Sequence, residues 1–494
     1  MQSEKNKTWQ AKDYVVTLLL FALHVIVTIG FCVLTIYLNV SGKSAFLNYF
    51  KNKETISEFT NLIIEMVIIT GVLYVYFAFE HGDFLVKRKN AFMILTLLQV
   101  SLVINYFLGK YIINEDYSIY ARPVALTAIL SLYLIGNRRS AIFMNVISAL
   151  MTFTMDMFTC AGLENKVLFA ELILNFTVGV IAVYVLDGIT NRFRIFLSGI
   201  FISFPVVLCV MCLEAPNNYT LLENFKIILF CVASGMLAVV LMMLLLPFFE
   251  GIFNIVTDFR LSEITSTQSK YMKELKEQAP GTFNHCITVA TLAENCASSI
   301  GENALHARAA AYYHDLGKIK EPEFFAENQK GYNPHDELSP ELSTDIIRSH
   351  ARVGAEFIKE RNLPEFLADV AFQHHGTLPI KYFYAKAKKY TENEVDIEDF
   401  SYPGPKPQTK IAAIIMICDA CEAKVRTMVD RSGEKVDKAV KEIIEERMDL
   451  EQFTDCDITL KELEIIRESI VTTLAGVYHS RVKYPKLKII KEDR

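Results

Sequence analysis

Hydrophobic and polar positions divide the chain into two halves with different patterns. Up to about Pro247 the residues are apolar with sparse charge, whereas after Asp258 Glu, Lys, Asp and Arg recur every few residues. A helix needs about 20 mostly apolar residues to cross the hydrocarbon core of a bilayer. The change in composition predicts a membrane domain over residues 1–250, a linker helix over 251–278 and a polar domain over 279–494.

Eight apolar runs in the first half are candidates for transmembrane helices. The first is too long for the core of a signal peptide and no clear cleavage site follows it, so we interpret it as a retained anchor. The fourth is the shortest. The runs are Tyr14–Leu38, Leu62–Phe79, Ala91–Ile113, Pro123–Ile135, Ala141–Phe158, Val167–Leu186, Phe196–Cys212 and Ile227–Phe248.

Basic residues occur in every second predicted loop, at Lys87-Arg88-Lys89, Arg138-Arg139 and Arg192/Arg194. Loops rich in Lys and Arg stay on the cytoplasmic side of a membrane. Eight spans therefore predict that both termini and the polar half lie in the cytoplasm. The carboxylates that fall in or near the spans, Glu65, Asp156 and Glu171, are expected close to a membrane surface without a functional role.

Apolar residues from Thr282 onward recur at helical spacing, and strand-like alternation is scarce. The predicted fold class is all-α, with a polytopic helical membrane domain followed by a cytoplasmic all-α domain. In the linker, Leu261, Ile264, Tyr271 and Leu275 fall near heptad spacing. This spacing fits either a short coiled coil in a homodimer or a helix that lies on its own domain.

Charge and cysteine content narrow the function classes. The 494 residues carry a formal net charge of -6, which argues against a nucleic acid polymer as partner. The ten cysteines are scattered and show no disulfide framework, so reduced thiols are expected in the polar half.

The candidate chemistry centres on the run His314-Asp315-Leu316-Gly317-Lys318. An imidazole beside a carboxylate offers a nitrogen ligand and an oxygen ligand that can bridge two metals. Lys318 lies on nearly the same helical face as Asp315 and suits a phosphate, although a cation at a helix C-terminus is the alternative. Further nitrogen and oxygen ligands in apolar helical context are His285, His350, His374, His375 and Asp419, whereas His306 and His335 are interpreted as surface and loop groups.

These motifs follow one another in an order that resembles the HD-domain phosphohydrolases. The resemblance is strongest to the membrane-bound bacterial seven-transmembrane HD proteins of the PgpH type, which hydrolyse cyclic di-AMP. The motifs that carry it are Gly281-Thr282-Phe283-Asn284-His285, His314-Asp315-Leu316-Gly317-Lys318, Asn333-Pro334-His335-Asp336, His374-His375-Gly376-Thr377 and Asp419.

The resemblance implies a site with two divalent transition metal ions, iron or manganese, in a multi-pass protein of the bacterial cell membrane. One metal would be held by His285, His314, Asp315 and Asp419, and the other by Asp315, His350, His374 and His375. A water or hydroxide between the metals would attack phosphorus and yield pApA. Asp315 and Lys318 would be the catalytic residues, with Lys318 on a phosphate oxygen.

Further substrate contacts are expected after the histidine pair and near Asp419. Tyr382 and Tyr384 would stack an adenine base, with core packing as the alternative. Arg426 would contact a second phosphate, with a helical ion pair to Glu422 as the alternative.

Three features depart from the family pattern. Only a short connection, about 39–61, stands where the family has a large extracellular domain; Cys286 replaces the usual serine; and Cys418 and Cys421 flank Asp419. We expect the two flanking thiols to be reduced and packed in a helix. Competing functions are hydrolysis of cyclic di-GMP, which the missing Gly-Tyr-Pro signature disfavours, and a receptor that binds nucleotide without cleaving it.

Overall fold

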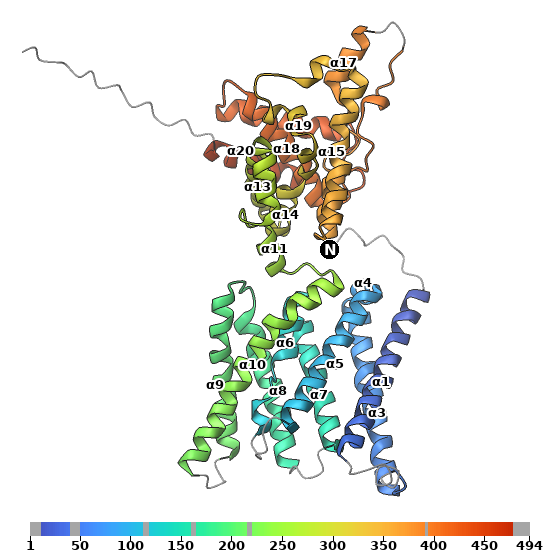
Figure 1. Ribbon diagram of the computed structural model, residues 1–494, viewed down its shortest axis with the longest axis vertical. Coiled ribbons are helices and arrows are strands. Elements are labelled where there is room, and N and C mark those ends of the chain that lie inside the picture. Colours follow the sequence, from blue (N-terminus) through green and yellow to red (C-terminus); the bar gives the residue numbers. More distant parts are fainter. Residues whose placement is uncertain are drawn as a thin grey trace, which may run out of the picture. The chain divides into compact units, whose positions relative to one another are not determined.

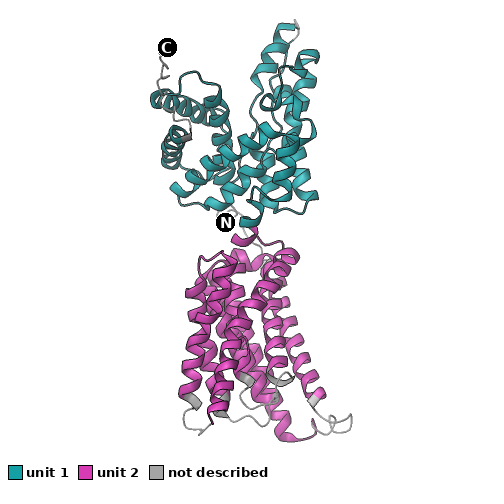
Figure 2. Cartoon of the chain, turned by 60° about the vertical axis from the view of Figure 1, so that its left-hand side comes forward, with its two compact units in different colours: residues 1, 261–494 teal, residues 2–260 magenta. Residues whose placement is uncertain are grey.

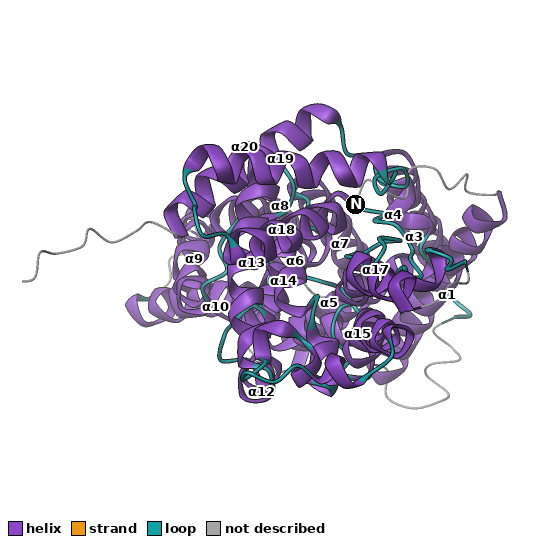
Figure 3. Ribbon diagram, turned by 90° about the horizontal axis from the view of Figure 1, so that it is seen from above, coloured by secondary structure: helices purple, strands orange, loops and turns teal. Residues whose placement is uncertain are grey.

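The computed structural model describes residues 11–39, 50–111, 118–159, 165–214, 220–390 and 394–477. They form two compact units that divide between Arg260 and Leu261 (Figure 2). Both units are built from helices and loops (Figure 3), and the one β-type pairing in these ranges is an isolated bridge between Pro379 and Ser401. The predicted all-α class is confirmed.

Among its described residues, the first unit contains seven helices that are long and apolar enough to cross a membrane; they are labelled in Figure 1. The chain is therefore a multi-pass membrane protein. The short helix α4 (Gly82–Val86) joins the second and third of them. The seven are α1 (Ala11–Asn39), α3 (Lys53–Glu80), α5 (Arg88–Tyr111), α7 (Arg138–Thr159), α8 (Asn165–Leu186), α9 (Arg192–Glu214) and α10 (Leu221–Phe253).

The predicted fourth span is not one long helix. It consists of the 3-10 turn η1 (Ser118–Ala121) and the ten-residue helix α6 (Leu126–Ile135). Ten helical residues are about 15 Å long, half the thickness of the hydrocarbon core. The Tyr133 hydroxyl donates to the carbonyls of Leu186 at 3.1 Å and Ile189 at 2.9 Å, which brings the end of α6 to the end of α8. Eight crossings stay a prediction, in which η1 and α6 together form the fourth.

One end of the membrane unit gathers the basic residues. Arg138, the first residue of α7, forms an ion pair with Asp187 just after α8. Arg139 Nη1 lies 3.7 Å from Glu80 Oε1 at the end of α3. The start of α7 and the ends of α3 and α8 therefore share one side.

The first and last membrane helices have ends on this same side. The Tyr74 hydroxyl, near the end of α3, donates to the carbonyl of Tyr14 near the start of α1 at 3.1 Å. Phe92 near the start of α5 contacts Phe253, the last residue of α10, with ring centroids 6.0 Å apart. The chain therefore enters the first membrane helix and leaves the last one at the basic end.

A buried ion cluster lies where the chain enters α6. The Arg122 guanidinium pairs with Asp156 near the end of α7, and its Nη1 lies 2.9 Å from Glu171 Oε1 near the start of α8. All three side chains are buried, and the Arg122 carbonyl accepts a 2.5 Å hydrogen bond from Ser234 of α10. Asp156 lies within one turn of the end of α7, and its pairing with Arg122 was not predicted. Both partners of Arg122 are more than 30 residues away in the sequence, so helical spacing could not predict the ion pair.

The second unit is a helical domain that begins in the predicted linker. Asn303, Ser339 and Thr409 cap three of its helices by accepting hydrogen bonds from backbone N–H groups. Its helices are α11 (Asp258–Ile264, the first three residues of which belong to the membrane unit), α12 (Lys270–Gln278), α13 (Pro280–Ser299), α14 (Ala304–Tyr313), α15 (Pro340–Glu360), α16 (Glu365–Gln373), α17 (Lys381–Tyr390), α18 (Lys410–Thr427), α19 (Gly433–Asp449) and α20 (Leu460–Val477), with the 3-10 turns η2 (Leu316–Lys320), η3 (Pro322–Phe324), η4 (Ala326–Asn328), η5 (Pro334–Glu337) and η6 (Glu398–Phe400).

The predicted linker helix over 251–278 is wrong as a single helix. Its first residues belong to α10, and α11 and α12 are separated by a turn that ends at the N-cap Ser269. The heptad positions Leu261 and Leu275 are fully buried in the monomer. These buried positions favour a linker that lies on its own domain. A homodimer stays a prediction.

Candidate metal centre

The seven predicted metal ligands converge from five places in the chain. His314 and Asp315 join α14 to η2, and Gly317 lets η2 pack directly on α15, since a Cβ there would lie 2.0 Å from the carbonyl oxygen of His350. The other ligands come from one face or one end of a helix: His285 on α13, His350 on α15, His374 and His375 at the end of α16, and Asp419 on α18.

Asp315 lies between two groups of imidazoles. Its Oδ2 is 3.3 Å from His314 Nε2 and 3.6 Å from His285 Nε2. Its Oδ1 is 3.4 Å from His350 Nε2 and 3.7 Å from His374 Nε2. One carboxylate thus presents a different oxygen to each group, which is the geometry of a ligand that bridges two metal ions.

Each group is compact enough to surround one ion. Ligand atoms of His285, His314 and Asp419 lie within 4.8 Å of one another, as do those of His350, His374 and His375. Asp419 also connects the groups, because its Oδ1 is 2.9 Å from His285 Nε2 and its Oδ2 is 3.8 Å from His375 Nδ1. The structure therefore brings all seven predicted ligands together.

Backbone carbonyls orient three of the imidazoles. Nδ1 of His314 lies 2.7 Å from the carbonyl oxygen three residues earlier, and the corresponding distances are 2.5 Å for His350 and 2.7 Å for His374. A ring nitrogen can meet a carbonyl oxygen only as a donor, so Nδ1 carries the proton and Nε2 keeps its lone pair. In all three residues Nε2 faces Asp315, as a metal ligand would.

Several of these atoms are buried without a partner in the described part of the chain. His314 Nε2 and both oxygens of Asp315 form no hydrogen bond there, although Oδ2 forms an ion pair with Lys318. Burial, with further contributions from Lys318 and His374, lowers the pKa of His350 to about 3, so its imidazole is neutral. Buried lone pairs without donors are costly unless a cation meets them. The donor set fits two divalent metal ions.

Glu422 contacts the ring nitrogen of His285 that faces away from the other ligands. His285 Nδ1 lies 2.5 Å from Glu422 Oε2, and both side chains are buried. Burial opposes the charged form, but hydrogen bonds to Asp419 and Glu422 raise the pKa of His285 to about 10. A carboxylate on the far nitrogen of a ligating histidine fixes the ring and strengthens it as a ligand. The sequence interpretation paired Glu422 with Arg426 and missed this role.

Glu422→Gln is expected to weaken metal binding at the His285 group by about 10- to 100-fold, because the amide removes the charge that supports the imidazole. Competition with a calibrated chelator measures this affinity. Glu445→Gln, the same change at an exposed position of α19, is the matched control. Equal metal affinity in Glu422→Gln and wild type would show that Glu422 does not support the site.

Lys318 lies at the edge of the site. Its Nζ is 2.7 Å from Asp315 Oδ2 and 3.0 Å from Glu327 Oε1, over the ring of Phe325. Burial opposes its charge, but Asp315 and then Glu327 hold the pKa of Lys318 well above its ordinary value. Lys318 thus presents a positive charge beside Asp315, and its contact with a phosphate stays a prediction.

Within the described ranges, none of the other predicted substrate contacts directly touches a metal ligand. Tyr382 is 66% exposed, and Tyr384 packs on Phe400. Arg426 Nη1 lies 3.9 Å from Glu422 Oε2, in the helical pair that was the alternative interpretation. Tyr382, Tyr384 and Arg426 stay predictions as substrate contacts.

The cysteines near the site are buried free thiols. Cys418 Sγ lies 3.9 Å from Cys296 Sγ, and Cys286 Sγ lies 3.9 Å from His314 Nδ1. Burial raises the pKa of Cys421 above its ordinary value, so this thiol stays protonated. The packed, reduced pair around Asp419 agrees with the prediction.

Two regions stand apart from the centre. His335 is buried in the loop before α15, and its Nε2 lies 3.0 Å from the carbonyl oxygen of Phe324, in agreement with its interpretation as a loop group.

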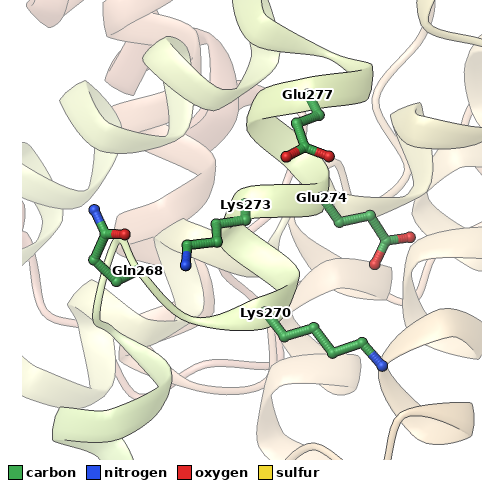
Figure 4. A pocket seen from close by; sticks show the side chains of 5 residues that line it. All are labelled: Gln268, Lys270, Lys273, Glu274 and Glu277. Carbon is green, nitrogen blue, oxygen red and sulfur yellow. The ribbon is translucent and has the colours of Figure 1, made fainter.

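A surface groove lies beside α12. It is lined by Gln268, Lys270, Lys273, Glu274 and Glu277, whose side chains point in different directions (Figure 4). Neither region contributes a ligand to the centre.

Tyr402 is a site residue that the sequence did not reveal. Its ring stacks on His375 with centroids 4.3 Å apart and an interplanar angle of 28°. Burial, and to a smaller extent Asp419 and Asp315 against Lys318, raises the pKa of the Tyr402 phenol. It lies 27 residues after His375, in a Pro-Gly-Pro loop without periodicity, so no local signal pointed to it.

Two family models match the chain. The model described as "7TM receptor with intracellular HD hydrolase" matches residues 56–257, and the HD domain model matches residues 282–424. The first match covers the membrane unit from α3 onward, and the second contains all seven predicted metal ligands.

Relatives support the same assignment. Cyclic-di-AMP phosphodiesterase PgpH of Bacillus subtilis is 36% identical over 439 residues, covering 88% of this chain and 61% of the relative. PgpH of Listeria monocytogenes is 36% identical over 449 residues, covering 89% and 60%. The chain thus spans about three fifths of the length of these relatives.

A solved structure is similar to about two fifths of this chain. The crystal structure of the L. monocytogenes PgpH HD domain in complex with cyclic-di-AMP shares 48% sequence identity, covers 43% of this chain and 99% of that chain, and has a TM-score of 0.42. The family models and the curated relatives together show that the chain carries the two domains of the family described as 7TM receptors with an intracellular HD hydrolase.

Proposed function

We propose that the protein is a membrane-anchored, metal-dependent phosphodiesterase that hydrolyses cyclic di-AMP to pApA. The observation that carries the proposal is Asp315, whose two oxygens face two separate groups of histidines. The relatives named cyclic-di-AMP phosphodiesterase are similar over nearly nine tenths of this chain, and the HD domain solved with cyclic-di-AMP shares 48% identity.

The site suits two divalent transition metals, and we propose iron or manganese because imidazole nitrogens and carboxylate oxygens serve both. Such ions supply Lewis-acid polarisation of a phosphoryl oxygen and activation of water near neutral pH. His285, His314 and Asp419 would hold one ion, and His350, His374 and His375 the other, with Asp315 shared.

The chain's own residues prepare the site for a phosphodiester. Lys318 presents its ammonium beside Asp315 and is expected to contact a non-bridging phosphate oxygen. Asp315 remains ionised, since Lys318 and then His314, against the effect of burial, hold its pKa well below its ordinary value. Burial of most ligands excludes bulk water and strengthens every electrostatic contact at the reacting phosphate.

We propose that the basic end of the membrane unit faces the cytoplasm of a bacterial cell. Arg138 and Arg139 lie at this end, together with the start of α1 and the end of α10. The positive-inside rule then places both termini, and the metal centre that follows α10, where a cytoplasmic nucleotide is available.

Incubation of the full-length protein in detergent with cyclic di-AMP or cyclic di-GMP, with Mn²⁺ or Fe²⁺ and then with chelator, tests the proposal. We expect metal-dependent formation of pApA that chelator stops, and slower cleavage of cyclic di-GMP. Preferential cleavage of cyclic di-GMP would contradict the substrate assignment. Tight nucleotide binding with no product in either metal would instead favour a receptor.

A further inference from the structure

Tyr402 is attached to the segment that carries the histidine pair. The N–H of Tyr402 donates to the carbonyl of Leu378 at 3.1 Å, and the N–H of Ile380 donates to the carbonyl of Phe400 at 2.7 Å. The N–H of Leu378 in turn donates to the carbonyl of His375 at 3.1 Å. This short ladder fixes the backbone of Tyr402 relative to His375, although 27 residues separate them in sequence.

The segment itself is anchored. Gly376 has a φ of 52°, and a Cβ there would lie 2.2 Å from Gln452 Oε1. The Gln452 amide exchanges two hydrogen bonds with Thr377, from Thr377 N at 3.0 Å and to Thr377 Oγ1 at 2.9 Å. The segment that follows His375, and the backbone of Tyr402 that is hydrogen-bonded to it, are therefore held in place by several contacts.

The ring forms part of the wall of the metal centre. Besides stacking on His375, it meets the His350 imidazole edge-on, with centroids 6.1 Å apart and an interplanar angle of 86°. An aromatic face on one ligand and an edge on another restrict the rotation of both imidazoles. Tyr402 therefore touches two candidate ligands of the same group.

The ligand on which Tyr402 stacks is among the more exposed side chains of the centre. The His314 side chain is fully buried, whereas the side chains of His375, Asp419 and Lys318 are 21%, 14% and 12% exposed. A substrate phosphate must approach through these more exposed groups. Since Tyr402 is stacked on His375, the most exposed ligand, the phenol borders these groups.

The Tyr402 hydroxyl forms no hydrogen bond with any residue in the described ranges, while the charges of Lys318, Asp419 and Asp315 act on it. Lys318 already forms ion pairs with two carboxylates, so fewer of its N–H groups are available to bind an incoming anion. A phenol is a neutral donor that an anionic oxygen can recruit without separating an ion pair.

We propose that Tyr402 is a substrate-contacting residue whose hydroxyl donates a hydrogen bond to a non-bridging phosphate oxygen of the bound cyclic dinucleotide. The inference rests on the proposed function and adds a donor that neither the motifs nor the metal ligands supply. The hydrogen bond strengthens as negative charge develops on that oxygen, so its loss should fall mainly on kcat.

Tyr402→Phe tests the hydroxyl while keeping the ring. We expect kcat/KM for cyclic di-AMP to fall about 10- to 100-fold, most of it in kcat, as for loss of a hydrogen bond to a charged group. Metal content and the shape of the pH–rate profile should match wild type. Tyr390→Phe, the same change at an exposed position of α17, is the matched control and should be unaffected.

Two results would overturn the proposal. Activity of Tyr402→Phe within twofold of wild type would exclude a hydroxyl contact, and a fall in activity matched by lost metal would assign Tyr402 to positioning His375 alone. If wild type cleaves no cyclic dinucleotide, the proposed function fails and equilibrium binding of cyclic di-AMP decides. A reproducibly weaker Kd in Tyr402→Phe then supports a hydrogen bond to the bound nucleotide, and a Kd equal to wild type refutes it.

Discussion

Asp315→Asn should reduce cyclic di-AMP hydrolysis by more than about 10³-fold, because metal activation of water near neutral pH depends on an intact site. The substitution replaces one carboxylate oxygen with an NH2 group. Whichever way the amide turns, a donor faces either the His314 and His285 pair or the His350 and His374 pair. One of the two groups thus loses its shared ligand and both lose its charge.

Initial rates with cyclic di-AMP, together with elemental analysis of the same preparation, measure this effect. Asp345→Asn, on the exposed side of α15 beside Arg348, makes the same chemical change away from the centre and should keep full activity. An Asp315→Asn variant that retained a tenth of wild-type activity and both metals would refute the bridging role.

Arg122→Leu should destabilise the membrane unit by about 3–5 kcal/mol, the cost of removing one partner from a buried ion pair. The guanidinium contacts both Asp156 and Glu171, and all three side chains are buried between α6, α7 and α8. Its removal leaves two buried carboxylates without the cation that they share. Thermal unfolding in detergent, followed by labelling of the buried thiols Cys32 and Cys231, measures the change.

Two further variants separate charge from packing. Arg139→Leu removes an exposed arginine 3.7 Å from Glu80 and should change stability by less than about 1 kcal/mol. Replacing Arg122, Asp156 and Glu171 together with apolar residues should recover most of the loss, since no unpaired charge remains. If Arg122→Leu and Arg139→Leu unfold at the same temperature, the cluster contributes no special stability.

The sequence was sufficient for the ligands and insufficient for what surrounds them. His285, His350 and Asp419 could be predicted because polar groups within apolar helical runs need a reason to be there. The length of the apolar runs similarly predicted the long membrane helices. In both cases the signal is local, within one helix.

The residues that sequence reasoning missed depend on contacts between distant segments. Glu422 has an arginine four residues later, so the helical pair concealed its hydrogen bond to His285, which is 137 residues away. Arg122 meets Asp156 and Glu171 across 34 and 49 residues, and Tyr402 reaches His375 through a loop. No spacing rule reports such partners, because tertiary packing alone brings them together.

In the linker, the sequence pattern also failed to identify the packing partner. Heptad spacing in this segment fitted either a seam between two chains or a helix on its own domain, and Leu261 and Leu275 are buried within one chain. Apolar periodicity identifies a face that needs a partner, and the partner here is the chain's own domain.

The central claim is that one carboxylate joins two groups of histidines that each hold a metal ion. Elemental analysis of full-length protein purified with its native metals tests this claim most directly. We predict two transition metal ions per chain in wild type and one in His350→Ala, which removes a ligand from a single group. A single ion in wild type, or an unchanged count in His350→Ala, would contradict the account.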